Sequence, residues 1–234
     1  MAVFVIRVFL YALAAVAAGT AAVRFGWWRE HIGRAWTLFS LEFVLLLVNY
    51  VLRREAPDAR VVLDSTLIAA NVAQIAAYWL MSRVLASAGI GYLIGRTKRI
   101  LLTLAALAVA VLLCHASLSA QWVALRSGAV QPGSLVSVLA DVITFTLVAP
   151  LAMSTVTLRG GQLSWIFGFL TLSVFGWMIN TGAPSIVGVW SGGAEALRAV
   201  RLAGVAIAAL ANAAAATAQV MATIRVMKGA LPDV

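Results

Sequence analysis

Long apolar runs recur along the chain, separated by short charged or turn-rich breaks. Seven segments hold enough apolar residues for a helix to cross a bilayer, which needs about 20 of them. They cover residues 3–23, 35–52, 61–82, 100–120, 134–157, 163–180 and 199–224. The runs are continuously apolar instead of alternating, which argues against a membrane β-barrel. The pattern therefore predicts an all-α bundle of seven transmembrane helices, with residues 1–234 forming a single membrane domain.

Composition agrees with this prediction. Of the 234 residues, 63% are hydrophobic and 11% are charged, whereas soluble domains average about 45–50% apolar and about 25% charged residues. A soluble core of this size cannot hide so much apolar surface from water. These figures exclude a soluble enzyme, a disulfide-rich secreted domain and a disordered chain. The single cysteine, Cys114, excludes an internal disulfide and a multi-cysteine metal site.

The net charge of +9 would suggest nucleic-acid binding in a soluble protein. Here the basic residues gather in the breaks, which membrane topology explains better, so we expect the lipid bilayer and no nucleic acid as a partner. The N-terminal segment and the second, fourth and sixth breaks carry Arg7, Arg53, Arg54, Arg60, Arg126, Arg198 and Arg201. The other breaks and the tail carry the larger set: Arg24, Arg29, Arg34, Arg83, Arg96, Lys98, Arg99, Arg159, Arg225 and Lys228. The larger set should face the cytoplasm, which predicts an N-terminus outside and a cytoplasmic C-terminus.

Polar side chains inside the spans are the candidates for ligand or proton binding, because a charge in hydrocarbon is costly. They are Arg7, Glu42, Asp64, Asn71, Gln74, His115, Asp141, Asn180 and Asn212. Residues 64, 71, 74, 78 and 82 follow helical spacing and share one face of the third segment. Two interpretations stay open. The side chains join helices by hydrogen bonds, with Asp64 and Asp141 neutralising Arg7, or they line an outward-open cavity between the third, fifth, sixth and seventh segments.

Two further features concern helix shape and packing. Pro150 lies inside the fifth segment, where a missing backbone hydrogen bond favours a kink. Such a kink either acts as a hinge or shapes the bundle. The seventh segment is rich in alanine between residues 206 and 218. Small residues let helices approach closely, so this segment should pack tightly within the bundle or against a partner subunit.

The chemistry that the chain lacks narrows its function. Its two lysines, Lys98 and Lys228, fall outside the spans, so we expect no retinal Schiff base. Histidines occur only at positions 31 and 115, which excludes paired-histidine haem binding but leaves a single haem or chlorophyll-type ligand at His115. Phosphate-binding loops, zinc-protease motifs and paired-carboxylate runs are missing from the sequence. We therefore expect no enzymatic activity, and the cofactor stays unknown.

Two stretches resemble a known group of membrane modules. One is Gly33-Arg34-Ala35-Trp36-Thr37-Leu38-Phe39-Ser40, and the other runs from Asp141 through Ala149-Pro150-Leu151 to Leu158-Arg159-Gly160-Gly161 and Ser164-Trp165. Together they resemble the seven-helix modules that precede histidine-kinase or diguanylate-cyclase domains in many bacteria. The resemblance implies a sensor in the bacterial cytoplasmic membrane. The 234 residues include no output domain, so it also implies signalling through a separate protein.

Three functions are consistent with these features. The first is a receptor-like or sensory module with an outward-facing polar cluster. The second is an accessory subunit of a larger membrane complex, favoured by the small size and the alanine-rich segment. The third is a small proton-linked transporter, which would use Glu42, Asp64 and Asp141.

Overall fold

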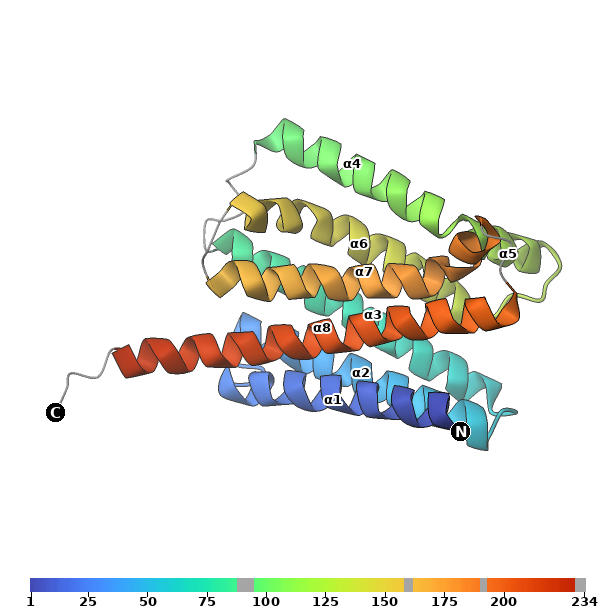
Figure 1. The fold of residues 1–234 in the computed structure, drawn as a ribbon, viewed down its shortest axis with the longest axis horizontal. Coiled ribbons are helices and arrows are strands. Elements are labelled where there is room, and N and C mark those ends of the chain that lie inside the picture. Colours follow the sequence, from blue (N-terminus) through green and yellow to red (C-terminus); the bar gives the residue numbers. More distant parts are fainter. Residues whose placement is uncertain (88–94, 158–161, 190–192, 230–234) are drawn as a thin grey trace.

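The protein is helical throughout the described part of the chain. The structure, a computed structural model, describes residues 1–87, 95–157, 162–189 and 193–229. These residues form eight helices and no strand (Figure 1). The helices are α1 (Ala2–Arg24), α2 (His31–Glu55), α3 (Arg60–Ser87), α4 (Arg96–Leu113), α5 (His115–Arg126), α6 (Pro132–Thr157), α7 (Gln162–Val189) and α8 (Ala194–Gly229). The predicted all-α class is confirmed for the described residues.

The length and hydropathy of the helices are those of a multi-pass membrane protein. Within the described ranges, α1, α2, α3, α6, α7 and α8 are each long and apolar enough to cross a bilayer. Helices α4 and α5 pass the same test only together, and their axes differ by 69°. The described residues thus hold six candidate spans, or seven if the bent pair crosses as one.

The prediction of one continuous helix over residues 100–120 is wrong, because that helix breaks at Cys114. The amide of Cys114 still bonds to Ala110, and α5 then starts in a new direction. Two hydrogen bonds hold α5 against α7. The Ala116 amide donates to Ser185 Oγ at 3.1 Å, and Ser117 Oγ donates to the Thr181 carbonyl at 2.6 Å. These contacts stabilise the bent arrangement.

The sixth predicted span also ends too early, because α7 continues past residue 180 to Val189 and includes Pro184. The added turns carry Thr181 and Ser185, which bond to α5. Helix α6 likewise continues through Pro150 to Thr157. Both prolines therefore lie inside helices that extend beyond them.

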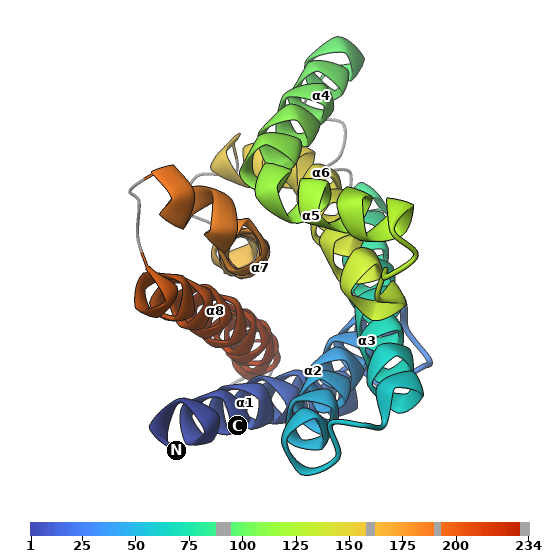
Figure 2. The ribbon, with the colours of Figure 1, turned by 90° about the vertical axis from the view of Figure 1, so that its right-hand side faces the viewer.

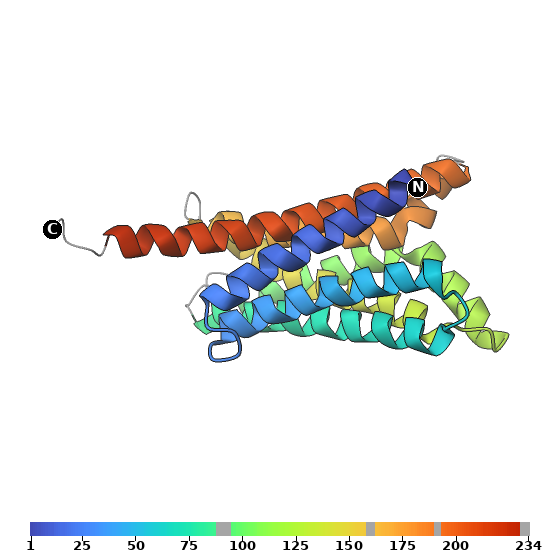
Figure 3. The ribbon, with the colours of Figure 1, turned by 90° about the horizontal axis from the view of Figure 1, so that it is seen from below.

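Six helices form a closed ring. Helix α1 packs beside α2 and α8, and the ring continues from α2 through α3, α6 and α7 back to α8. Figure 2 views this ring from one end, with α4 and α5 outside it against α6 and α7. Figures 1 and 3 place the N-terminus, the α2–α3 turn and the start of α8 at one end of the bundle. We call it the N-terminal end, and the last turns of α8 extend past the opposite end.

The alanine-rich helix packs within the bundle, against α7 and α1. At one close contact with α7, a Cβ added to Gly204 would lie 2.6 Å from the Asn180 amide nitrogen and 2.7 Å from the Gly176 carbonyl oxygen. Ser173 Oγ also donates to the Ala208 carbonyl at 2.9 Å. We call this contact the α7–α8 seam. Glycine is required there because the two backbones touch.

Candidate functional site

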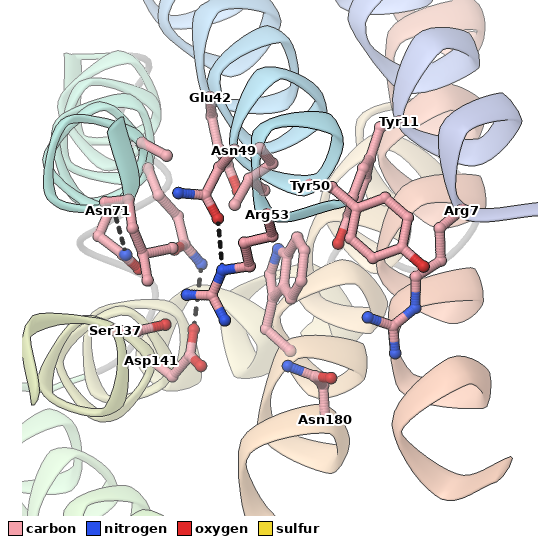
Figure 4. A pocket seen from close by; sticks show the side chains of 15 residues that line it. Arg7, Tyr11, Glu42, Asn49, Tyr50, Arg53, Asn71, Ser137, Asp141 and Asn180 are labelled. Atoms are coloured by element: carbon pink, nitrogen blue, oxygen red, sulfur yellow. Dashed lines mark hydrogen bonds between the residues drawn. The ribbon is translucent and has the colours of Figure 1, made fainter. Parts of the chain in front are cut away.

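A polar cavity of about 220 Å³ lies inside the helix ring. Figure 4 shows the side chains that line it, which come from α1, α2, α3, α6 and α7. They are Arg7, Tyr11, Glu42, Leu46, Asn49, Tyr50, Arg53, Leu67, Ala70, Asn71, Gln74, Ser137, Asp141, Trp177 and Asn180. Helical periodicity explains the convergence, because each helix contributes residues spaced three, four, seven or eleven apart.

Two buried carboxyl groups form the floor of the cavity. Glu42 is 2% exposed and Asp141 is 3% exposed. Asp141 accepts hydrogen bonds from Thr181 Oγ1 and, at 3.5 Å, from Gln74 Nε2. Glu42 Oε1 is buried and has no hydrogen-bond partner. Since a buried polar atom without a partner costs free energy, Glu42 offers an acceptor that a bound hydrogen-bond donor could satisfy.

Two arginines line the same cavity. Arg53 Nε donates to Asn49 Oδ1 at 3.1 Å, and Figure 4 shows the Arg53 guanidinium extending between α2 and the opposite helices. The guanidinium carbon of Arg7 lies 5.4 Å from the centre of the Tyr50 ring, and Arg7 Nε is buried without a hydrogen-bond partner. In the described part of the chain neither arginine forms an ion pair. The interpretation in which Asp64 and Asp141 neutralise Arg7 is thus not accompanied by a direct ion pair among the described residues.

A second polar recess, of about 380 Å³, adjoins the cavity. The two share Arg7, Arg53, Leu67, Ser137 and Asn180, and the recess adds side chains from α5, α6, α7 and the start of α8. We call it the vestibule. Because α5 and the start of α8 lie at the N-terminal end (Figure 1), the vestibule connects the cavity with that end. Arg201 adds a third arginine to its wall.

The structure brings six of the nine sequence candidates together. Arg7, Glu42, Asn71, Gln74, Asp141 and Asn180 all line the cavity.

The other three candidates lie elsewhere. Asp64 accepts a hydrogen bond from the Gly133 amide at 3.2 Å, which joins α3 to the first turn of α6. His115 is exposed at the start of α5 and lines a separate, apolar recess. Asn212 is 1% exposed in α8, away from the cavity, and neither of its amide atoms has a hydrogen-bond partner.

The predicted set of cavity helices is only partly right. The third, fifth and sixth predicted spans correspond to α3, α6 and α7, which do line the cavity, but α1 and α2 take the place expected for α8. Helix α8 contributes only Arg201, in the vestibule. The sequence signal for α2 was the spacing of Glu42, Asn49 and Arg53, seven and then four residues apart. The corresponding signal in α1 was Arg7 followed by Tyr11, one turn later.

The donor set of the cavity suits a small polar molecule better than a metal ion. Among the described residues, no group of three or more His, Cys, Asp or Glu side chains is placed to hold a metal. The cavity does offer carboxylate and amide acceptors together with guanidinium donors. It can therefore bind a molecule that carries both donors and acceptors.

No protein-family model, curated protein or solved structure matches the chain. Within the sensor-module resemblance, residues 158–161 lie outside the described residues. The functional argument therefore depends on the cavity.

Proposed function

We propose that the chain is a receptor-like membrane module without enzymatic activity, which binds a small polar solute in the cavity. The observation that carries this proposal is the buried, unpartnered carboxyl oxygen of Glu42, which faces a polar space inside a membrane bundle. The cavity volume of about 220 Å³ is below the ~300–1,000 Å³ typical of pockets for drug-sized ligands. A solute of a few heavy atoms suits it.

The charges indicate the class of solute. Glu42 and Asp141 favour an ammonium or another N–H donor, while Arg7 and Arg53 favour a carboxylate or another anionic group. A small zwitterion satisfies both sides at once and cancels the charges that the cavity holds apart. We therefore propose a short amino acid or a similar zwitterion as the ligand.

In the proposed topology α4 and α5 cross the membrane as one bent span, so the chain crosses seven times. The N-terminus lies outside the bacterial cytoplasmic membrane and the C-terminus lies in the cytoplasm. The excess of basic residues in the breaks on the C-terminal side supports this orientation. The vestibule then opens outward, where a receptor would sample its ligand.

A thermal-unfolding series on the purified protein tests the ligand proposal. The probes are glycine, β-alanine and 4-aminobutyrate. We expect at least one of them to raise Tm with increasing concentration, because a ligand that binds the folded state stabilises it. Acetate and methylammonium, which each carry one of the two charges, should bind at least tenfold more weakly. Glu42→Gln should abolish the shift. Glu195→Gln, an exposed position at the start of α8, should leave it intact. The proposal is contradicted if both variants show a Tm shift of equal size, or if none of the zwitterions raises the Tm of the unmodified protein.

Cysteine labelling tests the orientation separately. In a Cys114→Ala background, Asp58→Cys places a thiol in the α2–α3 turn, and Glu30→Cys places one in the exposed α1–α2 connection. A membrane-impermeant maleimide should label the first variant in intact cells and the second only after permeabilisation. The reverse pattern would show that the vestibule opens to the cytoplasm.

A proton-linked transporter is the second candidate function. Glu42 and Asp141 face one cavity that has an open route to one end of the bundle, which is a suitable arrangement for exchanging a proton against a solute. Proteoliposomes distinguish the two, because a transporter accumulates the radiolabelled zwitterion under a proton gradient whereas a receptor only binds it. Co-purification in mild detergent would reveal partner membrane subunits or a separate signalling protein.

A further inference from the structure

An apolar groove of about 550 Å³ lies outside the helix ring, between α4, α6 and α7. Its wall includes Leu102 and Val109 from α4, Phe145 from α6, and Gly168 and Leu172 from α7. We call it the α4 groove. It is much larger than the polar cavity and almost entirely apolar, so it does not share the chemistry of the proposed zwitterion site.

The groove is open space, as the glycine on its α7 wall shows. A Cβ added to Gly168 would meet no heavy atom within 4 Å, apart from its own helix. Eight residues further along the same helix, Gly176 is in backbone contact with α8. Helix α7 is thus in backbone contact with α8 at the seam but leaves open space beside Gly168 at the groove. Inside a bilayer such a groove is filled by hydrocarbon, because an empty one forfeits its van der Waals contacts.

A basic cluster marks the α4 end of the groove. Arg96, Lys98 and Arg99 are all exposed in the first turn of α4. Lys98 and Arg99 precede Leu102 by four and three residues, so they share the helix face that lines the groove. Helix α4 contains no acidic residue that could neutralise them. Long basic side chains can cover apolar surface while their charged ends reach the membrane interface.

We infer that the α4 groove binds an anionic phospholipid, with one acyl chain between α4, α6 and α7 and the phosphate at Lys98 and Arg99. The apolar wall fits the chain, and the basic cluster selects the negative head group over a zwitterionic one. Figures 1 and 2 show that the start of α4 lies away from the six-helix ring, at the end opposite the N-terminus. In the proposed topology the head group lies in the cytoplasmic leaflet.

Native mass spectrometry on delipidated protein tests this inference. Phosphatidylglycerol and phosphatidylcholine with identical acyl chains are the probes. We expect phosphatidylglycerol to bind at least tenfold more tightly, and the Lys98→Gln/Arg99→Gln double variant to lose that preference while still binding both lipids.

A matched pair of glycine variants tests the acyl-chain position. Gly168→Leu fills the groove without a clash and should weaken binding of both lipids at least tenfold. Gly188→Leu is the control, because Gly188 also faces open space on α7 but does not line the groove. Equal lipid binding in the two variants, or no preference for phosphatidylglycerol, overturns the inference. A dimer that Gly168→Leu dissociates would also overturn it, because the groove would then hold a second copy of the chain. Thermal shifts with the zwitterion probes should be the same in both variants, so the two proposals fail independently.

Discussion

Two regions of helix α7 differ in how closely they are packed: the seam with α8 and the wall of the α4 groove. At the seam, Gly176 and Gly204 let two backbones touch, and Ser173 bonds to the Ala208 carbonyl. At the α4 groove, a Cβ added to Gly168 on the same helix would have no neighbouring heavy atom within 4 Å. The same residue type thus marks both a close backbone contact and an open position. The difference indicates that α7 belongs to a closed ring, to which α4 is added from outside.

This difference has a physical origin, because the hydrophobic effect does not drive helices together within lipid. Apolar side chains lose nothing by facing acyl chains, so membrane helices associate through close packing and interhelical hydrogen bonds. The seam has both. Helix α4 packs on α6 and α7 mainly through apolar side chains near its C-terminal end. The hydrogen bonds to the ring come from the next helix, where Ala116 and Ser117 bond to α7.

The largest effect should come from replacing a glycine of the seam with a larger residue. A Cβ on Gly204 would overlap backbone atoms of Asn180 and Gly176, which cannot move as a flexible side chain can. Overpacking of this kind costs about 1–3 kcal/mol. We expect Gly204→Ala to lower the free energy of unfolding by about 2 kcal/mol, measured by SDS titration in mixed micelles. Gly168→Ala adds the same atom in open space and should cause no loss. Equal destabilisation by the two substitutions would show that the two sides of α7 do not differ in packing.

Much of this fold could be predicted from the sequence, because hydrophobic run length is a strong signal for membrane helices. Six predicted spans correspond to single helices, although α7 extends to Val189. The break at Cys114 was missed because it depends on Ser185 and Thr181, which belong to a distant part of the chain. Residues 113–115 themselves contain no glycine or proline that would mark a break.

An intermediate effect should distinguish Asp141 from Asp64, the two aspartates inside predicted spans. Asp141 faces the cavity, whereas Asp64 holds the Gly133 amide outside it. Asp141→Asn should leave the protein folded and inserted but reduce the zwitterion-induced rise in Tm, because the negative charge on the floor is lost. Asp64→Asn should leave that rise unchanged and lower stability by about 1 kcal/mol, since it weakens a charge-assisted hydrogen bond. Unchanged binding in Asp141→Asn would remove this aspartate from the ligand site.

The candidate site was harder to predict than the spans, for a geometric reason. Periodicity assigns a side chain to a helix face, but it does not say which faces meet. Asn71 and Gln74 were recognised from their shared face, and the structure places both in the cavity lining, on the helix between α2 and α6. Asn212 has an equally polar position in its span, yet α8 packs against α7 and α1 and keeps that side chain out of the cavity. The contribution of Arg53 depended on α2 extending beyond the predicted span to Glu55.

The smallest effect should appear where α5 joins the ring. The Ala116 amide lies in the first turn of α5, where backbone amides lack a partner within the helix, and Ser185 Oγ of α7 accepts its hydrogen bond. Ser185→Ala removes this acceptor and should cost about 1 kcal/mol. We expect faster hydrogen–deuterium exchange of the α5 amides and no change in the exchange of α7 and α8 at the seam. Ser119→Ala is the matched control, because Ser119 Oγ donates within α5 itself, to the Ala116 carbonyl. If both variants exchange at the wild-type rate, the bond to Ser185 does not hold α5 in place. The bend is then stabilised by the remaining contacts, which include the bond from Ser117 to the Thr181 carbonyl and the packing of Leu113 against Gly182.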